Sequence, residues 1–387
     1  MAERREVVVI GGGISGTVAA YDLARSGARV TLIERGAALA AMASGWTLAG
    51  VRQSGRLAPE VPLAQAAVQR WEHLNQELDA ETEYRQQGNL RLARTPDEVT
   101  VIRAMVDEQK ALGLEISFLP DNSAVRDVAP ALSETVLAAS YCPTDGHANP
   151  KMVVNAFGRA AEQEGVTIHM NTEVTEIVAA GGRVQGVRAN NDMIAADAVV
   201  VAAGVYTDRL VRPFGIEIPI TITQAIVAQT IPAAPLLAQV LGVANGDVAG
   251  RQEVSGRLRF TGTSLPWRSP DPTYDAMALL PPAGEIAALV QRTAAVFPAF
   301  GTLGLEHLWG GLLDMTPDAL PVIERAEQVE GLVVAAGFSG HGFCLGPATG
   351  RILSELVMTG TSSLPIEAFR SSRFASGQPV TEALLHG

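Results

Sequence analysis

Three glycines near the N-terminus have the spacing of a turn that binds a dinucleotide. Gly11, Gly13 and Gly16 follow the pattern G-x-G-x-x-G. The first glycine permits a tight turn, the second lets backbone N–H groups approach a pyrophosphate, and the third lets a helix pack closely on the preceding strand. Glu34 follows at the distance at which an acidic side chain accepts a hydrogen bond from a ribose 2′-hydroxyl. These residues predict a site for an adenine dinucleotide without a 2′-phosphate, which is either FAD or NAD.

The elements predicted around this motif argue against a purely structural glycine turn, which is the alternative interpretation. Residues 7–10 form a buried apolar strand, a helix continues from the turn to about residue 25, and a second buried strand ends at Glu34. The N-terminus of this helix offers unpaired backbone N–H groups and the positive end of its dipole to the phosphates. We therefore expect Ile14 and Ser15, which lie inside the turn, to contact the cofactor together with the glycines.

A second glycine-rich loop occurs near the C-terminal end of the chain. It comprises residues 337–343, Gly-Phe-Ser-Gly-His-Gly-Phe, and it follows a buried strand at residues 331–337. Pro347 is predicted to lie in the first turn of a helix that runs to about residue 358. The positive end of that helix would stabilise the negative charge of a reduced isoalloxazine ring. One complete dinucleotide motif together with such a loop favours FAD over NAD, because an enzyme that uses both flavin and nicotinamide usually needs two complete motifs.

FAD is an elongated ligand, so its site must be built from segments that lie far apart in the chain. Residues 43–52 are small, hydroxylated and rich in glycine, so their backbone can run against a flat ligand. Residues 173–175 and 202–204 are expected to approach it as well. The residues predicted to contact FAD are Gly11, Gly13, Ile14, Ser15, Gly16, Glu34, Arg35, Ser44, Gly45, Thr47, Ala49, Gly50, Val174, Ala203, Gly204, Gly337, Gly340, His341, Gly342 and Phe343.

The composition argues against several other classes of protein. The 387 residues, of which 47% are hydrophobic and 38 are glycine, fit a globular α/β enzyme that is long enough for two domains. The formal net charge of -12 and the lack of a basic run argue against binding to nucleic acid or to an anionic membrane surface. Two cysteines without metal-ligand spacing predict no metal site and a reducing, cytoplasmic compartment. No apolar run reaches the ~20 residues that a transmembrane helix needs.

The pattern of elements predicts two domains that interleave along the chain. An open parallel sheet with helical crossovers would bind its ligand at the carboxyl ends of its strands. Residues 217–312 differ, because they are β-rich and interrupted by prolines, with one amphipathic helix at residues 283–297. The expected fold class is therefore α/β, with a Rossmann-like FAD-binding domain and a discontinuous, β-rich α+β domain that binds the substrate. The predicted boundaries are residues 1–82, 146–216 and 313–387 for the FAD-binding domain, and residues 83–145 and 217–312 for the substrate-binding domain.

Further elements follow from local patterns. Helices are predicted where apolar residues recur at helical spacing, and strands where the sequence alternates or has a short apolar run. The helices are expected at residues 62–80, 96–112 and 151–164, and the strands at residues 83–92, 114–119, 166–170, 173–177, 184–189, 198–204 and 218–229. The region from residue 120 to residue 143 is predicted to be rich in loops.

The two glycine-rich loops and several short motifs between them resemble the family of FAD-dependent amino-acid and amine oxidoreductases. This family includes D-amino-acid dehydrogenases, glycine oxidase, sarcosine and dimethylglycine oxidising enzymes, and hydroxyproline dehydrogenases. The resemblance implies that the chain binds FAD, folds into two domains and removes a hydride from the carbon beside an amine nitrogen. The segments that carry it are residues 8–16, 34, 43–45, 145–150, 200–204, 309–311, 315–318 and 337–343.

Three positions depart from the pattern of that family. The resemblance places Cys344 where sarcosine-oxidase-like relatives have a lysine that helps to bind the substrate carboxylate. It places Gly311 where a cysteine commonly attaches the flavin, which implies that FAD is bound non-covalently here. Leu313 stands where glycine-oxidase-like members have an arginine. The usual anchors for the substrate carboxylate are therefore missing.

Hydride transfer to a flavin needs chiefly a well-positioned substrate with a neutral amine, so a cationic anchor is the group to look for. Arg52 follows the segment that is expected to pass the flavin ring, and Arg251 opens a strand of the covering domain. Arg259 and Arg268 are further candidates. The alternative for each of them is a solvated surface charge, which is the commoner position for arginine.

Two more side chains complete the predicted catalytic set of Arg52, Arg251, His341 and Tyr274. Tyr274, with the nearby Arg268, is assigned to an entry loop. His341 lies in the second glycine-rich loop beside the expected flavin. It either makes a hydrogen bond near flavin N1–C2=O or to the substrate, or it stiffens the loop through a bond to backbone.

The predicted function is that of an FAD-dependent amino-acid dehydrogenase or oxidase that converts a CH–N bond into an imine. A cyclic, N-substituted or D-amino acid of the hydroxyproline, proline or sarcosine type is favoured, because residues 315–318 resemble the sarcosine and hydroxyproline branch. The electron acceptor is dioxygen, a quinone or a partner redox subunit, and the protein is either a homo-oligomer or part of a hetero-oligomer. Two alternatives stay open: an FAD-dependent oxidoreductase of 2-hydroxy acids, and a flavoprotein subunit that is active only inside a heteromeric dehydrogenase complex.

Overall fold

The computed structural model describes residues 4–269, 271–272 and 275–375. A six-stranded sheet organises the part that contains the first glycine motif, and its strands are β1 (Glu6–Ile10), β2 (Arg29–Ile33), β8 (Thr167–His169), β12 (Ala198–Val201), β19 (Val322–Arg325) and β20 (Leu332–Ala336). The strand order is β19-β20-β12-β1-β2-β8, and all neighbours are parallel except β19, which is antiparallel to β20. The central strand β1 is buried because both faces of the sheet are covered, which explains its continuous run of apolar residues.

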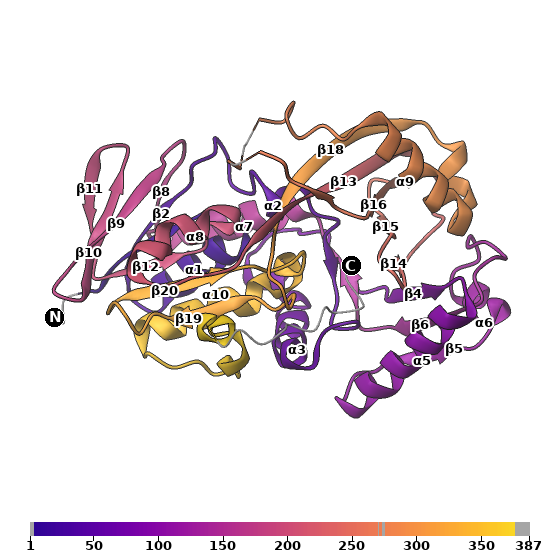
Figure 1. Ribbon diagram of the computed structural model, residues 1–387, viewed down its shortest axis with the longest axis horizontal. Coiled ribbons are helices and arrows are strands. Elements are labelled where there is room, and N and C mark those ends of the chain that lie inside the picture. The colour runs from indigo at the N-terminus through magenta and orange to yellow at the C-terminus, as the bar shows by residue number, and fades with distance from the viewer. Residues whose placement is uncertain (1–3, 270, 273–274, 376–387) are drawn as a thin grey trace.

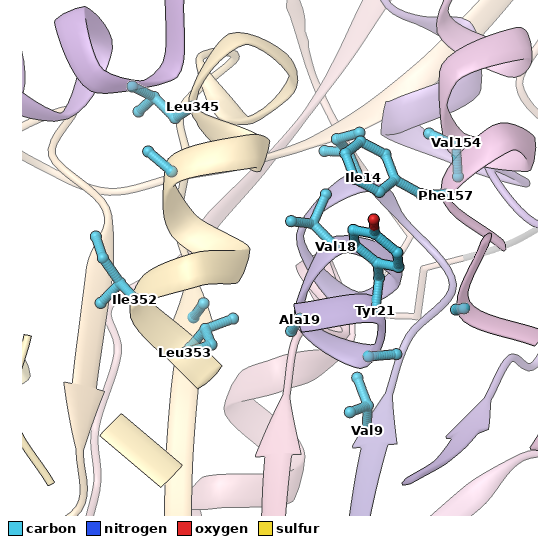
Figure 2. Packing of buried hydrophobic residues seen from close by; sticks show 14 of the residues in the cluster. Val9, Ile14, Val18, Ala19, Tyr21, Val154, Phe157, Leu345, Ile352 and Leu353 are labelled. Carbon is cyan, nitrogen blue, oxygen red and sulfur yellow. The ribbon is translucent and has the colours of Figure 1, made fainter. Parts of the chain in front are cut away.

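Four helices lie over one face of this sheet: α1 (Ile14–Arg25), α3 (Val61–Trp71), α7 (Pro150–Gln163) and α10 (Gly342–Met358). Figure 2 shows α1 between α7 and α10, with apolar side chains filling both contacts. Gly346 and Gly350 of α10 face Ile14 and Val18 of α1, and a Cβ atom on either glycine would lie 2.4 Å from the facing side chain. The two helices can therefore approach this closely only because these positions carry no side chain.

A three-stranded antiparallel sheet and a short helix cover the opposite face: β9 (Val174–Ala180), β10 (Arg183–Ala189), β11 (Asp192–Ala195) and α8 (Thr207–Val211). Val8 of β1 packs on this side with Val187 and Leu210. Val7 and Val9, which point the other way in the pleated strand, pack against the helices. The first glycine motif thus leaves a strand that is fixed on both faces.

A second, nine-stranded sheet occupies the other side of the molecule in Figure 1, with helices α5 (Pro96–Ala111), α6 (Asn122–Val128) and α9 (Ala283–Val296). Its strands are β4 (Asn89–Ala93), β5 (Ser117–Leu119), β6 (Ala138–Cys142), β13 (Thr221–Pro232), β14 (Val240–Val243), β15 (Val248–Gln252), β16 (Arg257–Gly262), β17 (Leu265–Pro266) and β18 (Leu305–Met315). β4 pairs in parallel with β14, so two segments that are far apart in the chain share this sheet. The domain boundaries given above stay a prediction.

Several short elements connect these parts: α2 (Ala43–Trp46), α4 (Leu74–Glu77), and the antiparallel pair β3 (Gly50–Val51) and β7 (Gly146–His147). Short 3-10 helices occur at Ala58–Glu60, Gly204–Tyr206, Arg212–Phe214, Pro298–Thr302, Glu367–Phe369 and Ser371–Phe374. None of the helices in the described part of the chain combines the length and the apolar character that crossing a membrane requires.

Some of the elements predicted from local patterns differ from those observed. The helix expected at residues 62–80 stops at Trp71, and a separate turn, α4, follows it. The indole N–H of Trp71 donates to the carbonyl oxygen of Cys344 at 2.9 Å, so tertiary contact fixes the end of α3. The region expected to be rich in loops contains α6 and β6. Asp121 caps α6 by accepting from the N–H of Ala124, and β6 is held between β4 and β5.

The helix after the second glycine-rich loop begins at Gly342, earlier than expected, and Pro347 lies inside it rather than in its first turn. Phe343 and Cys344, in the additional turn, are both buried. The ring of Phe343 lies 5.1 Å from that of Trp71, between centroids. Burial of these two side chains stabilises a turn that glycine-rich sequence alone would not favour.

Candidate functional site

A first cavity opens at the carboxyl ends of β1, β2 and β12, where ligands bind in open parallel sheets. Of the residues predicted to contact the cofactor, eight line it: Gly11, Gly13, Glu34, Arg35, Ser44, Val174, Ala203 and Gly204. They come from five separate stretches of the chain. The structure therefore brings these sequence-predicted residues together around one space.

The glycine motif has the geometry that its spacing predicts. Gly11 has φ +111°, and a Cβ there would lie 2.3 Å from the carbonyl oxygen of Ala202. A Cβ on Gly16 would lie 1.9 Å from the carbonyl oxygen of Gly11, so α1 packs directly on the turn. Gly13 precedes α1 as its N-cap and faces the cavity. Gly16 itself lines neither cavity, so its part in the site is packing.

Glu34 and the start of α1 define the polar walls of the first cavity. The carboxylate of Glu34 accepts from the backbone N–H of Gly12 at 2.7 Å and from that of Gly36 at 2.5 Å. These two bonds hold a buried carboxylate at the cavity wall, where it can accept from a hydroxyl group. The N–H of Ile14 donates to Oγ of Ser44 at 3.0 Å, which ties α2 to the helix N-terminus.

A second cavity adjoins the first and extends to the nine-stranded sheet. Its volume is about 480 Å³, within the range of ~300–1,000 Å³ that is usual for small-molecule sites. Gly13, Ser44, Gly204 and Asp314 line both cavities, so the two form one elongated site. The sequence-predicted residues that line the second cavity are Gly13, Ile14, Ser15, Ser44, Thr47, Gly50, Arg52, Gly204, Gly340, His341, Gly342 and Phe343.

The second glycine-rich loop delivers the N-terminus of α10 to this second cavity. Gly337 and Gly340 have φ +69° and +86°, values that glycine adopts without strain. The carboxyl group of Asp314 accepts from the N–H of Gly337 at 2.7 Å and so fixes the start of the loop. Burial raises the pKa of Asp314 to about 6. Gly337 supports the loop from behind and does not line the cavity.

Three buried arginines line the second cavity: Arg52, Arg56 and Arg91, referred to here as the arginine cluster. The Arg52 side chain donates to the carbonyl oxygen of Ser54 at 2.9 Å, and that of Arg91 to the carbonyl oxygen of Val243 at 3.2 Å. Arg56 donates through Nε to the carbonyl oxygen of Arg52, while its Nη1 has no hydrogen-bond partner among the described residues. Burial and the charge of Arg56 lower the pKa of Arg91 to about 10. An anionic ligand would relieve this accumulation of positive charge.

Two buried carboxyl groups balance part of that charge. Asp145 accepts from the backbone N–H groups of Gln53 and Ser54 at 2.7 and 3.3 Å. Burial raises the pKa of Asp145, and these hydrogen bonds together with the charge of Arg52 act in the opposite direction. Glu60 is the second carboxyl group, and it is fully buried. Within this group, three arginines and two carboxylates leave one positive charge in excess. Asp314 also lines the second cavity, but it lies at the start of the second loop, and none of the three arginines contributes to the shift of its pKa.

Glu60 pairs with His341 of the second loop. Nδ1 of the imidazole lies 3.1 Å from each carboxylate oxygen. Burial raises the pKa of Glu60, but the interactions with His341 and with the arginines outweigh it and lower that pKa overall. Burial, reinforced by the charge of Arg56, lowers the pKa of His341 to about 4. The imidazole is therefore neutral at physiological pH and lies in the cavity wall.

The structure places several predicted site residues elsewhere. Arg251 does not line the cavity: its Nε donates to the carbonyl oxygen of Leu48 at 2.5 Å, and its Nη2 to that of Ala148 at 3.1 Å. The alternation of apolar and polar residues along a strand does not show that the Arg251 side chain binds backbone carbonyl groups behind the cavity wall. Arg268 is exposed, and Tyr274 lies outside the described residues.

Three other positions have structural roles instead of cavity-facing ones. Gly45 lets α2 pack, because a Cβ there would lie 1.9 Å from the carbonyl oxygen of Ala40. Ala49 is fully buried and has φ +61°. Arg259 donates from Nη1 to the carbonyl oxygen of Thr47 at 2.8 Å. These residues shape the segment that borders the cavity.

Sequence reasoning missed Arg56, Arg91 and Glu60. A charged side chain between the leucines of β4 was a usable signal for Arg91, because a charge in a buried strand needs a partner or a ligand. Arg56 and Glu60 gave no such signal. Glu60, for example, lies 281 residues in the sequence from the histidine that it contacts. Cys344 is a buried side chain. Its Sγ lies 3.3 Å from the N–H and 3.2 Å from the carbonyl oxygen of Arg52, which it holds in position.

Residues 6–356 match the family model DAO, described as FAD dependent oxidoreductase. The chain is 28% identical over 388 residues to the sarcosine oxidase subunit beta of Arthrobacter sp, with 97% of this chain and 93% of that relative covered. It is 27% identical over 386 residues to the 4-methylaminobutanoate oxidase (formaldehyde-forming) of Paenarthrobacter nicotinovorans, with 96% of this chain covered. It covers 46% of that enzyme and so spans about half its length. Among solved structures, L-proline dehydrogenase from P. horikoshii has a TM-score of 0.88 and 28% identity, with 98% of this chain and 100% of that chain covered.

Proposed function

This chain belongs to the DAO family of FAD-dependent oxidoreductases, and we propose that it oxidises the CH–N bond of an amino acid to an imine. Membership in the family confirms the resemblance stated from the sequence, the α/β fold class and FAD as the cofactor. It also confirms an oxidoreductase that acts on amine donors. The identity of the substrate and the roles of individual residues are the subject of the proposal.

The residues present fit FAD across the two adjoining cavities. We assign the adenosine and pyrophosphate to the first cavity, where Gly13 and the N-terminus of α1 face the phosphates and Glu34 accepts from the ribose. The isoalloxazine ring is assigned to the second cavity, against the N-terminus of α10. Gly311 lines that cavity without a nucleophilic side chain, which supports non-covalent binding.

The arginine cluster is the observation that supports an amino-acid substrate. Its single excess positive charge matches one carboxylate, and the unpartnered Nη1 of Arg56 offers a donor for it. The same excess charge disfavours a protonated amine beside the arginine cluster and so favours the neutral form, whose nitrogen lone pair can drive the oxidation. FAD, when bound, accepts the hydride. The protein contributes orientation, charge and exclusion of water.

A cyclic or N-substituted amino acid is our proposed substrate class. The likeness to a proline dehydrogenase and to a sarcosine oxidase subunit supports it. We propose a dehydrogenase or oxidase whose acceptor is dioxygen, a quinone or a redox subunit. The similarity to a subunit of sarcosine oxidase also supports a heteromeric complex. The two buried, unlinked cysteines support a cytoplasmic location.

The proposal is tested by mixing the purified yellow protein anaerobically with a panel of acids. The panel pairs each acyclic amino acid with the hydroxy acid of the same skeleton, for example alanine with lactate. Proline is paired with tetrahydrofuran-2-carboxylate, a ring ether that serves as the unreactive control. Bleaching of the flavin absorbance by amino acids supports the proposal. Bleaching by hydroxy acids alone would refute it in favour of CH–OH oxidation. Admitting air then separates an oxidase, which recovers its colour at once, from a dehydrogenase, which does not.

A further inference from the structure

We propose that Glu60 holds His341 in the tautomer that carries its proton on Nδ1, so that Nε2 accepts a hydrogen bond from the N–H of the substrate. Glu60 is thereby a positioning residue, and the site selects amines that keep an N–H in their neutral form. The inference rests on the proposed oxidation of amino acids and specifies the substrate class of that same cavity.

The contact between the two side chains determines the position of the proton. Glu60 ends the 3-10 helix before α3, and His341 is the N-cap residue of α10. Both carboxylate oxygens lie 3.1 Å from Nδ1. A carboxylate only accepts hydrogen bonds, so Nδ1 must donate. A neutral imidazole has one proton, which leaves a lone pair on Nε2.

Nε2 of His341 is left without a partner inside the protein. It is a buried polar atom with no hydrogen-bond partner among the described residues, and the whole residue is 6% exposed. His341 lines the second cavity, so the acceptor can be satisfied from that space. An unsatisfied buried acceptor is costly, and a ligand that donates to it gains the hydrogen bond and removes that cost.

The position of the arginine cluster indicates which donor this is. His341 and the arginine cluster line the same cavity, and the charges of Arg56 and Arg52 act on both members of the pair. The acceptor and the proposed carboxylate site therefore share one space. In an α-amino acid the nitrogen is separated from the carboxylate carbon by one carbon atom. Its N–H is therefore the donor nearest to an anchored carboxylate. A hydrogen bond from it to Nε2 also fixes the direction of the nitrogen lone pair before hydride transfer.

This arrangement discriminates by the number of substituents on nitrogen. A neutral primary or secondary amine, including a ring nitrogen, has an N–H for Nε2. A neutral tertiary amine has none, and its additional alkyl group would point at a buried acceptor. Discrimination of this kind is strong when a site is built to accept a particular hydrogen bond, because the analogue leaves a buried polar group unpaired.

The test measures binding of three unreactive ligands to the FAD-loaded protein by flavin difference spectra and by calorimetry. Pyrrole-2-carboxylate has an N–H, furan-2-carboxylate has oxygen in its place, and N-methylpyrrole-2-carboxylate has a methyl group there. We expect the wild type to bind the first at least about tenfold more tightly than the other two. His341→Leu should abolish that preference, and His341→Gln, which restores an acceptor, should recover part of it.

Glu60→Gln separates positioning from general support of the fold. An amide can donate as well as accept, so either tautomer becomes possible and the preference for the N–H ligand should fall. Loss of a negative charge beside Arg56 should leave binding of furan-2-carboxylate unchanged or tighter. A role in stability alone would weaken all three ligands equally. His147→Gln is the matched control, because His147 is also buried and neutral but does not line the second cavity, and it should leave the preference intact.

An unchanged preference in His341→Leu, or equal weakening of all ligands in Glu60→Gln, would overturn the inference. If His341→Leu fails to accumulate as a yellow protein, the Glu60→Gln and His341→Gln measurements decide the question. Failure of the proposed function has a different signature, because no amino acid would then bleach the wild-type flavin. If amino acids bleach the flavin of the wild type but the preference for the N–H ligand is the same in these variants, only the role of Glu60 and His341 is rejected.

Discussion

Replacing Arg56 with methionine tests the assignment of the carboxylate site. Methionine keeps an unbranched apolar stem in the buried position but removes the guanidinium group. A hydrogen bond to a charged group contributes about 1.5–3 kcal/mol, which corresponds to about 10- to 150-fold in affinity. Arg52 and Arg91 stay in place, and Arg91 is released from the repulsion that lowers its pKa. We therefore expect an increase in Kd near the lower end, about tenfold.

The assay is anaerobic titration of the yellow protein with furan-2-carboxylate, followed by steady-state kinetics with the best amino acid from the panel. KM should rise more than kcat falls, because a carboxylate anchor binds the substrate and the transition state alike. The flavin content should not change, since Arg56 does not line the first cavity. Arg268→Met, at an exposed position, is the matched control. A Kd for Arg56→Met within about twofold of the wild type would refute the assignment, given the strength of a charged hydrogen bond.

Three further changes probe the packing and the electrostatics. Gly16→Ala should yield a protein with little FAD, because its Cβ would lie 1.9 Å from a carbonyl oxygen of the glycine turn; flavin fluorescence released on heating measures this. Gly350→Ala should lower the free energy of unfolding by about 1–3 kcal/mol, because its Cβ would lie 2.4 Å from a valine of α1. Gly284→Ala, where α9 leaves open space, should instead be neutral or stabilising. Burial lowers the pKa of His147 in the folded protein to about 3. As the pH falls below about 6.5, this histidine is protonated in the unfolded chain but not in the folded one, so the free energy of unfolding decreases between pH 6.5 and pH 3, by at most about 5 kcal/mol. His147→Gln should reduce the loss of Tm between pH 7 and pH 4.5, and an unchanged loss would contradict this.

The cofactor half of the site was predictable because its signal is local. Residues 6–34 form one βαβ unit in which the first strand, the turn, the helix and the second strand are neighbours in sequence as well as in space. The spacing of three glycines is therefore sufficient to predict the turn and the residues that reach the first cavity. Six of the eight residues proposed to contact FAD in the first cavity lie in or just after that unit, or just after β12, which pairs with β1: Gly11, Gly13, Glu34, Arg35, Ala203 and Gly204.

The substrate half was not predictable in the same way, because tertiary contacts assemble it. Arg52 and Arg56 lie in an irregular segment, and Arg91 lies in a strand of the other sheet. Arg251 alternates as a strand residue should, yet the pattern does not say whether its side chain meets the cavity or the backbone behind it. Only the pairing of sheets and loops decides which arginines share a space.

The close contact of α1 with α10 joins the two helix N-termini that reach the two adjoining cavities. Neither helix can open locally without exposing the apolar face of the other, as the packing in Figure 2 shows. Their central amides therefore belong to one cooperative unit in hydrogen exchange and share a single free energy of opening. Removal of FAD should increase the exchange rates of both helices together, although Val18 and Gly342 are 324 positions apart in the sequence.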